Sequence, residues 1–148
     1  MDEETKSAPV LEETNDFPAM LSLARESGLE SDKLTGIVNA CGFYLDGILV
    51  GCAALKRVDD LFMVECLAVA EGMRGRGLGR TLVARIEEDA RAKGANRLCA
   101  IARQPRFFER IGYRMSSADD PGAPKNHDCA TCPQFGKSRR PAIVVKDL

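Results

Sequence analysis

One segment, in which a predicted strand turns into a predicted helix through a glycine-rich loop, constrains this chain more than any other. The strand pattern ends at Val69, a helix is predicted from Gly79 to Lys93, and the junction between them contains Gly72, Gly75 and Gly77. The helix has the clearest apolar periodicity of the sequence, carried by Leu78, Leu82, Val83, Ile86 and Ala90. The chain must therefore begin a helix almost directly after a strand.

The loop at this junction has the composition of an anion-binding site. Backbone N–H groups at the start of a helix point toward whatever lies there, and the helix dipole adds positive potential. Glycines let the backbone approach an anion closely, and Arg74, Arg76 and Arg80 add fixed positive charge. We therefore predict that the loop binds a pyrophosphate.

Two common phosphate-binding motifs do not match this loop. The dinucleotide fingerprint G-x-G-x-x-G would need a third glycine where Arg80 follows Gly75 and Gly77. A P-loop would end in Gly-Lys followed by Ser or Thr, whereas Gly77 is followed by Leu78. The pattern that remains is R-x-x-G-x-G, formed by Arg74, Gly77 and Gly79.

Turn signals and apolar patterns predict the elements around this junction. Asp46-Gly47 between two apolar runs predicts a tight hairpin. A strand over 61–69 is predicted to place five residues on one face, Leu61, Met63, Glu65, Leu67 and Val69. Further strands are predicted at 9–12, 97–102 and 142–145, and helices from 17 and over 107–111, with 29–38 a candidate short helix. The segment 117–141 is predicted to be a loop and residues 1–8 a flexible N-terminus.

Length, charge and composition exclude several classes of protein. The 148 residues fit a single domain, and 45% hydrophobic with 29% charged residues is ordinary for a globular chain. There is no apolar run of membrane-spanning length and no signal-peptide pattern, so we expect a cytoplasmic protein with no membrane partner. Residues 74–110 carry ten Lys or Arg against four acids. In a chain of net charge −1 this predicts a local anionic ligand, and 5% aromatic residues argue against nucleic-acid binding.

The glycine pattern, with Leu67-Ala68-Val69 before it and Phe107-Phe108-Glu109-Arg110-Ile111-Gly112-Tyr113 after it, resembles the GNAT superfamily of N-acetyltransferases. The resemblance extends over residues 9–148 as a single domain. It implies an α/β (α+β) fold, a mixed and twisted sheet of about six or seven strands flanked by helices. It also implies that the fourth and fifth strands splay apart and that acetyl-CoA, the cosubstrate, enters the gap.

The resemblance assigns cofactor-binding roles to three segments. The strand Leu67-Ala68-Val69 would pair with the pantetheine arm, and one of its N–H groups would polarise the thioester carbonyl. Phe107 and Phe108 would pack beside the cofactor. The pyrophosphate would be held by Arg74, Gly75, Arg76, Gly77, Leu78, Gly79 and Arg80.

The groups expected to move protons depart from the family pattern. Many GNAT enzymes carry a glutamate where this chain has Met63, and a tyrosine acid where it has Phe108. Glu65, two residues further along the strand, is the best candidate for the base that deprotonates the amine. The alternative is that Glu65 pairs with an arginine and binds substrate or has no role. The missing acid matters little, because a thiol pKa of about 8.5 makes thiolate a tolerable leaving group.

Six cysteines in a cytosolic chain predict mostly reduced thiols. Those among apolar neighbours are predicted to be small core residues, with Cys66 facing away from Glu65. Cys129 and Cys132 form a C-x-x-C pair near His127, which leaves free thiols, a disulfide and a metal open. No metal is assigned, since structural zinc needs four ligands. The core cysteines are Cys41, Cys52, Cys66 and Cys99.

The end of the chain, 135–148, and Ala102-Arg103 resemble the acetyltransferase domain of N-acetylglutamate synthases. This implies a small-molecule amine as partner and an acidic amino acid such as glutamate as acceptor. Arg103, Arg106 and Arg139 are candidates to bind its carboxylates. The alternatives are acetylation of a protein or xenobiotic amine, and an acetyl-CoA-binding module with weak transfer. A homodimer is also left open.

Overall fold

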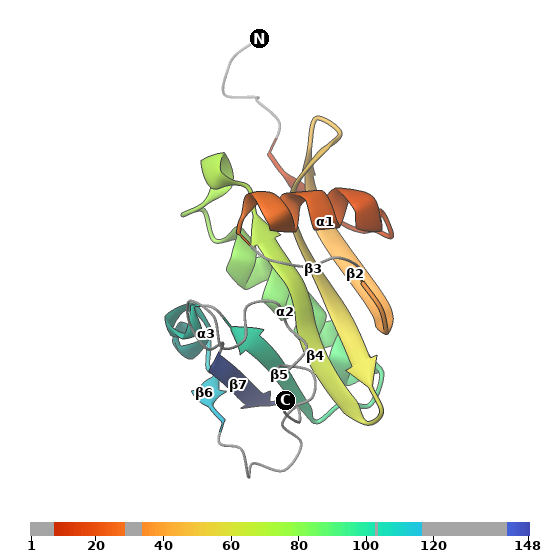
Figure 1. Ribbon diagram of the computed structural model, residues 1–148, viewed down its shortest axis with the longest axis vertical. Coiled ribbons are helices and arrows are strands. Elements are labelled where there is room, and N and C mark those ends of the chain that lie inside the picture. The colour runs from red at the N-terminus through yellow and green to blue at the C-terminus, as the bar shows by residue number, and fades with distance from the viewer. Residues whose placement is uncertain (1–7, 29–33, 103, 117–141) are drawn as a thin grey trace.

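The computed structural model describes residues 8–28, 34–102, 104–116 and 142–148. Within them the strands form one sheet in the order β1-β2-β3-β4-β5-β7-β6 (Figure 1). β4 and β5 run parallel, and the other neighbouring strands run antiparallel. The strands are β1 (Val10–Glu13), β2 (Ile37–Leu45), β3 (Ile48–Val58), β4 (Leu61–Val69), β5 (Arg97–Ala102), β6 (Arg114–Met115) and β7 (Ala142–Asp147).

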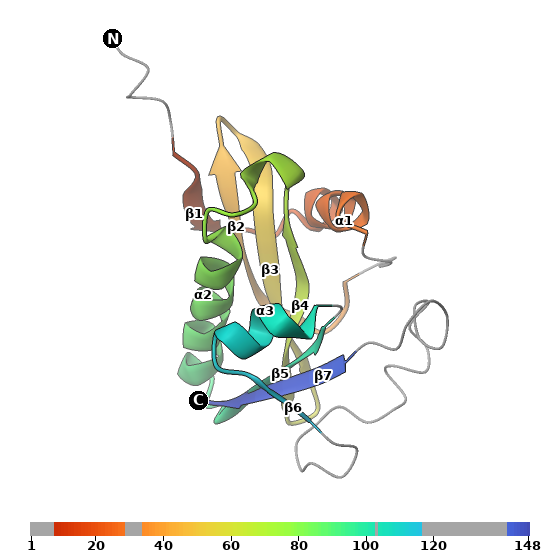
Figure 2. The same cartoon turned by 90° about the vertical axis from the view of Figure 1, so that its left-hand side faces the viewer.

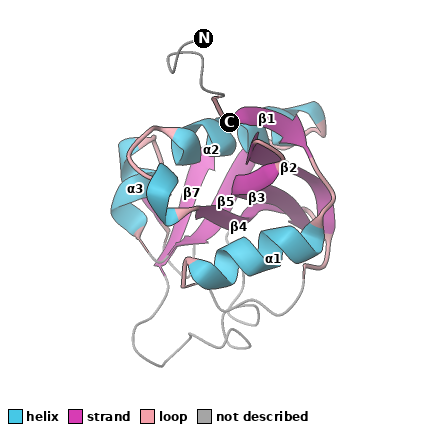
Figure 3. Ribbon diagram, turned by 90° about the horizontal axis from the view of Figure 1, so that it is seen from above, coloured by secondary structure: helices cyan, strands magenta, loops and turns pink. Residues whose placement is uncertain are grey.

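Helices cover both faces of this sheet. They are α1 (Phe17–Glu26), α2 (Leu78–Ala92) and α3 (Pro105–Arg110), with the short 3-10 turn η2 (Glu71–Met73) before α2. Figures 2 and 3 show α1 on one face and α2 on the other. The mixed sheet flanked by helices confirms the α/β (α+β) class expected from the sequence. Among the described helices, none has the length and apolar character needed to cross a membrane.

α1 and α2 pack against opposite faces of the central strands. The Asp16 side chain caps α1 by accepting a hydrogen bond from the Ala19 N–H at 3.2 Å. α1 then packs on Cys52 and Ala54 of β3 and on Cys66 and Ala68 of β4, through Met20, Leu23 and Ala24. On the opposite face the apolar stripe predicted for α2 is buried, namely Leu82, Val83, Ile86 and Ala90.

The hairpin expected at Asp46-Gly47 joins β2 to β3. Both residues have positive φ, 52° and 80°, as a type I′ turn requires. The strand after this turn pairs antiparallel with β2 along most of its length, and Ile37 opposes Lys56. The candidate helix over 29–38 is therefore wrong at its end, because Ile37 and Val38 belong to strand β2, which pairs with β3. Residues 29–33 lie outside the described part of the chain.

β4 and β5 separate soon after they meet. Their parallel pairing consists of Met63 opposite Cys99 and Val64 opposite Ala100. β4 nevertheless continues to Val69, while β5 continues beside β7 to Ala102. The expected splay of the fourth and fifth strands is thus present.

A β-bulge in β4 changes which side chains share a face. Glu65 opposes Ala54 and Ala68 opposes Cys52, so β4 has one more residue than β3 in this interval. The bulge includes Cys66, whose φ is 56°. Cys66 therefore packs on the α1 face with its neighbours of β3, which is also the face of Glu65.

The bulge corrects two predictions. Leu67 and Val69 pack in the core under α2, whereas Met63 and Glu65 lie on the other face of β4. Strict alternation along 61–69 therefore fails after Glu65. The expectation that Cys66 faces away from Glu65 fails for the same reason.

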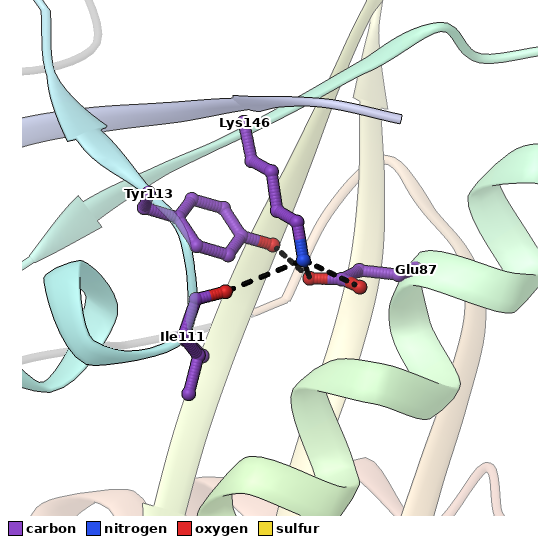
Figure 4. A network of polar contacts seen from close by, with 4 residues as sticks. All are labelled: Glu87, Ile111, Tyr113 and Lys146. Carbon is purple, nitrogen blue, oxygen red and sulfur yellow. Dashed lines mark hydrogen bonds and ion pairs between the residues drawn. The ribbon is translucent and has the colours of Figure 1, made fainter.

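A buried polar cluster joins α2 to the C-terminal part of the sheet (Figure 4). The i, i+4 spacing predicts a Glu87–Arg91 pair, but Glu87 is only 7% exposed and has other partners. It accepts a hydrogen bond from the Tyr113 hydroxyl at 2.8 Å and pairs with Lys146 Nζ at 3.2 Å. Lys146 also donates to the carbonyl oxygen of Ile111 at 3.3 Å. The cluster fixes the turn after α3 against α2 and β7.

Candidate acetyl-CoA site

The loop between β4 and α2 has an open backbone. Gly75 and Gly77 have φ of 79° and 81°, which L side chains rarely adopt. A Cβ atom built on either glycine, or on Gly72, would meet no atom within 4 Å. Gly77 is the N-cap of α2, no side chain among the described residues caps this end, and no acidic residue stands in its first turn. The start of α2 therefore combines free helix N–H groups, which favour an anion, with an open backbone directly before them.

The three arginines of the loop are exposed. Arg74 also has a structural contact, because its Nε donates a hydrogen bond to the Val69 carbonyl oxygen at 3.0 Å. This contact fixes the end of β4 relative to the loop. Arg76 and Arg80 add positive charge beside the N-terminus of α2, as the sequence predicted.

The two phenylalanines of α3 have different positions. A Cβ atom on Gly79 would lie 3.3 Å from Cζ of Phe107, so the ring of Phe107 covers the first turn of α2. Phe107 makes an edge contact with Phe108 at 5.1 Å between ring centroids. Phe108 is 6% exposed and packs against Tyr113 in the core. Phe107 therefore borders the loop directly, and Phe108 supports it from behind.

Glu65 lies on the α1 face of β4, directly before the bulge and just beyond the last residue pair between β4 and β5. Its carboxylate is 3.9 Å from Nζ of Lys56, and the two side chains are 27% and 19% exposed. Met63, at the position of the usual family glutamate, is 2% exposed and packs with Cys99 and Val145. A carboxylate on this face is thus supplied by Glu65.

The described cysteines are free and buried, as predicted. The Cys66 thiol lies 3.6 Å from the Met20 carbonyl oxygen, and the Cys52 thiol donates to the Cys66 carbonyl oxygen at 3.3 Å. The pKa of the Cys52 thiol is raised, first by its hydrogen bond with Cys66 and then by burial. Burial also raises the pKa of the Cys41 thiol, to about 11. These contacts fit core residues rather than nucleophiles.

Of the residues expected to bind the acceptor, only Arg106 is among those described, and it is exposed in the first turn of α3. Arg103 and Arg139 fall outside the described ranges, as do His127, Cys129 and Cys132. Within the described ranges no three His, Cys, Asp or Glu side chains gather as metal ligands. Lys56 was not predicted as a site residue, although it is the first charged residue after the apolar run of β3.

Comparisons with known proteins show the family to which the chain is similar. Residues 3–113 match the model of the acetyltransferase (GNAT) family. The amino-acid acetyltransferase of Mannheimia succiniciproducens is 28% identical over 107 residues, which cover 70% of this chain and 23% of that protein. The N-alpha-acetyltransferase 80 of Mus musculus is 40% identical over 72 residues, covering 46% of this chain and 23% of that protein.

A solved structure also has this fold. It is N-acetylglutamate synthase from Neisseria gonorrhoeae complexed with coenzyme A and N-acetyl-glutamate, with a TM-score of 0.77 and 26% identity. The match covers 97% of this chain and 36% of the synthase. This chain likewise spans only 23% of each of the two relatives above. Because the family model matches well over half of the sequence, the chain belongs to the acetyltransferase (GNAT) family, whose cosubstrate is acetyl-CoA.

Proposed function

We propose that this chain is an acetyl-CoA-dependent N-acetyltransferase that acetylates the amino group of an acidic amino acid, with glutamate as the first candidate. The observation that carries the proposal is the opening between β4 and β5, with the uncapped start of α2 at one end and Glu65 beside it. This arrangement offers an anion site for the cofactor and a carboxylate for the amine within one part of the sheet.

In this proposal the chain holds the cofactor mainly through backbone groups. The pyrophosphate lies at the loop from Arg74 to Arg80, and the pantetheine arm pairs with Leu67-Ala68-Val69. Phe107 closes the side of the loop, where its ring already covers Gly79. An N–H group of β4 near the bulge polarises the thioester carbonyl.

Glu65 acts on the acceptor. It takes a proton from the ammonium group, directly or through water, because only the neutral amine is a nucleophile. The amine nitrogen then bonds to the acetyl carbonyl carbon and loses its second proton to water, and the carbon–sulfur bond breaks to release coenzyme A thiolate. With Phe108 in the core, no acid stands at that position, and the thiolate takes its proton from solvent.

The acceptor is the part of the proposal drawn from the relatives. The amino-acid acetyltransferase and the N-acetylglutamate synthase both point to an amino acid. An acceptor with two carboxylates needs cations around it, and Arg103, Arg106 and Arg139 are the proposed partners. We also propose a cytoplasmic location, consistent with the free thiols of the described cysteines, and leave a homodimer to solution measurements.

A second candidate function has one supporting observation. The N-alpha-acetyltransferase 80 of Mus musculus matches a shorter part of this chain than the amino-acid acetyltransferase does, but with a higher sequence identity, 40% against 28%. The alternative acceptor is therefore the N-terminal amine of a peptide. A peptide lacks the free α-carboxylate beside its amine, so the two acceptors differ in charge at that position.

The test is release of free thiol from acetyl-CoA with a panel of acceptors. We expect glutamate to be acetylated faster than glutamine, lysine or a simple amine at equal concentration, and faster than a peptide N-terminus. Faster turnover of the peptide would favour the second function. If no acceptor releases thiol above hydrolysis, while acetyl-CoA still binds, the chain is a cofactor-binding module.

A further inference from the structure

The Lys56–Glu65 pair has a geometry that the cofactor site does not explain. Lys56 of β3 opposes Met63, and its Nζ reaches diagonally to Glu65 at 3.9 Å. Register places both side chains on the α1 face, next to the bulge at which β4 leaves β5. A cation is therefore fixed beside the carboxylate that we propose as the base.

The position of Lys56 is set by its surroundings. Its aliphatic stem lies against Gly36, where an added Cβ atom would be 3.5 Å from Cγ of Lys56. The side chain is 19% exposed, so the stem is largely covered and the ammonium reaches toward Glu65. The next residue, Arg57, lies on the opposite face, with its guanidinium over the ring of Phe62 and more than twice the exposure.

An α-amino acid has the charges that complement this pair. Its ammonium and carboxylate are attached to one carbon, so it presents a cation and an anion side by side. A contact of 3.9 Å between partly exposed charges stabilises a fold little, and it can be exchanged for substrate contacts at small cost. The substrate ammonium then meets Glu65, and the carboxylate next to it meets Lys56.

We infer that Lys56 binds the α-carboxylate of the acceptor and so restricts the reaction to amines that carry a neighbouring carboxylate. This inference rests on the proposed function, because it takes Glu65 as the group that receives the amine. It adds a specificity-determining residue and leaves the side-chain carboxylate of the acceptor to the arginines named above.

The test compares glutamate with γ-aminobutyrate, which is glutamate without its α-carboxylate. The native protein should have a higher kcat/KM for glutamate. Lys56→Met keeps the stem but removes the charge, and it should lower kcat/KM for glutamate by about tenfold or more, since a charge-assisted contact is lost. The same variant should leave kcat/KM for γ-aminobutyrate within about twofold, because that substrate has no α-carboxylate to lose.

Two variants serve as controls. Lys56→Arg should restore most of the preference for glutamate, because it retains the cation. Arg57→Met removes a cation from the same strand on the other face, and it should leave the ratio of the two kcat/KM values unchanged. The KM for acetyl-CoA should stay the same in all variants.

The outcomes separate this inference from the proposed function. If Lys56→Met lowers kcat/KM for both substrates equally, Lys56 acts through Glu65 or the fold, and the inference is wrong. An unchanged ratio in Lys56→Met, or a native protein that does not distinguish the two substrates, also overturns it, although acetylation of glutamate would still stand. If the native protein acetylates neither, the proposed function and the inference fail together.

Discussion

Gly77 and Gly47 have nearly the same backbone conformation but lie in different parts of the fold. Their φ angles are 81° and 80°, and an added Cβ atom would meet nothing within 4 Å at either position. Gly77→Glu and Gly47→Glu should therefore each cost about 1–2 kcal/mol of stability from backbone strain. Only Gly77→Glu puts a negative charge at the start of α2, and it should abolish acetyl-CoA binding.

Isothermal titration of both variants with acetyl-CoA measures this difference. Native affinity in Gly47→Glu makes the loss at Gly77 specific to the loop. If Gly77→Glu bound acetyl-CoA as tightly as the native protein, the pyrophosphate would have to lie elsewhere.

Glu65 has a testable chemical role, because its carboxylate is the proposed base. Glu65→Gln is nearly isosteric, and it should lower kcat by about 100-fold if Glu65 removes the proton directly. The KM for acetyl-CoA should change little, because Glu65 lies on the α1 face of β4 and outside the glycine-rich loop. Single-turnover measurements with glutamate separate the chemical step from binding, and a native rate would reassign the proton to water or to another carboxylate.

At the scale of elements, the cluster around Glu87 joins α2, β7 and the turn after α3. The Tyr113 hydroxyl donates to a buried carboxylate, and such hydrogen bonds contribute more than neutral ones. Tyr113→Phe should lower the free energy of unfolding by about 2 kcal/mol. Lys146 remains beside Glu87 in that variant, so the carboxylate keeps a partner.

The chain offers a matched control in Tyr44. Its hydroxyl shares a hydrogen bond of 2.7 Å with Thr14, which is part-buried and uncharged. Tyr44→Phe should lower the free energy of unfolding by about 1 kcal/mol or less, and urea titration of both variants measures the two losses. Equal losses in the two variants would mean that the charge of Glu87 adds nothing to the hydrogen bond of Tyr113.

Elements with local signals were predicted well from the sequence. The Asp46-Gly47 turn, the start of α1 at Phe17, the strand over 97–102 and the periodicity of α2 depend on neighbours a few residues away. The bulge at Cys66 was missed, because it depends on how β4 pairs with β3, and pairing register leaves no mark in a short apolar run. The partners of Glu87 lie 26 and 59 residues away, which helix spacing alone could not reveal.

The candidate site divides in the same way. Its loop was found from the glycines and arginines that adjoin each other in the sequence, and Phe107 from the motif that follows. Lys56 was missed because its contact with Glu65 joins the neighbouring strands β3 and β4, and it depends on the register between them. Sequence patterns therefore located the glycine loop of the candidate site but did not indicate the Lys56–Glu65 pair.

For the whole molecule, the sheet consists of two parts that meet at β4 and β5. β1 to β4 form one antiparallel part and β5, β7 and β6 the other, and the described pairing between them consists of two residue pairs. A cofactor inserted in the opening would contact both parts. Acetyl-CoA binding should therefore stabilise the entire fold rather than one segment.

The size of this effect follows from mass action, since the cofactor binds only the folded chain. At about 100 times its Kd, acetyl-CoA should add about 2.7 kcal/mol to the free energy of unfolding. In a domain of this length each kcal/mol raises Tm by about 2–4 °C, so the expected increase is about 5–10 °C. Differential scanning calorimetry at increasing acetyl-CoA concentrations should show one transition that shifts as a whole. A native transition that splits, with only one part moving, would mean that the ligand contacts one side of the opening, and the Gly77→Glu protein should not shift at all.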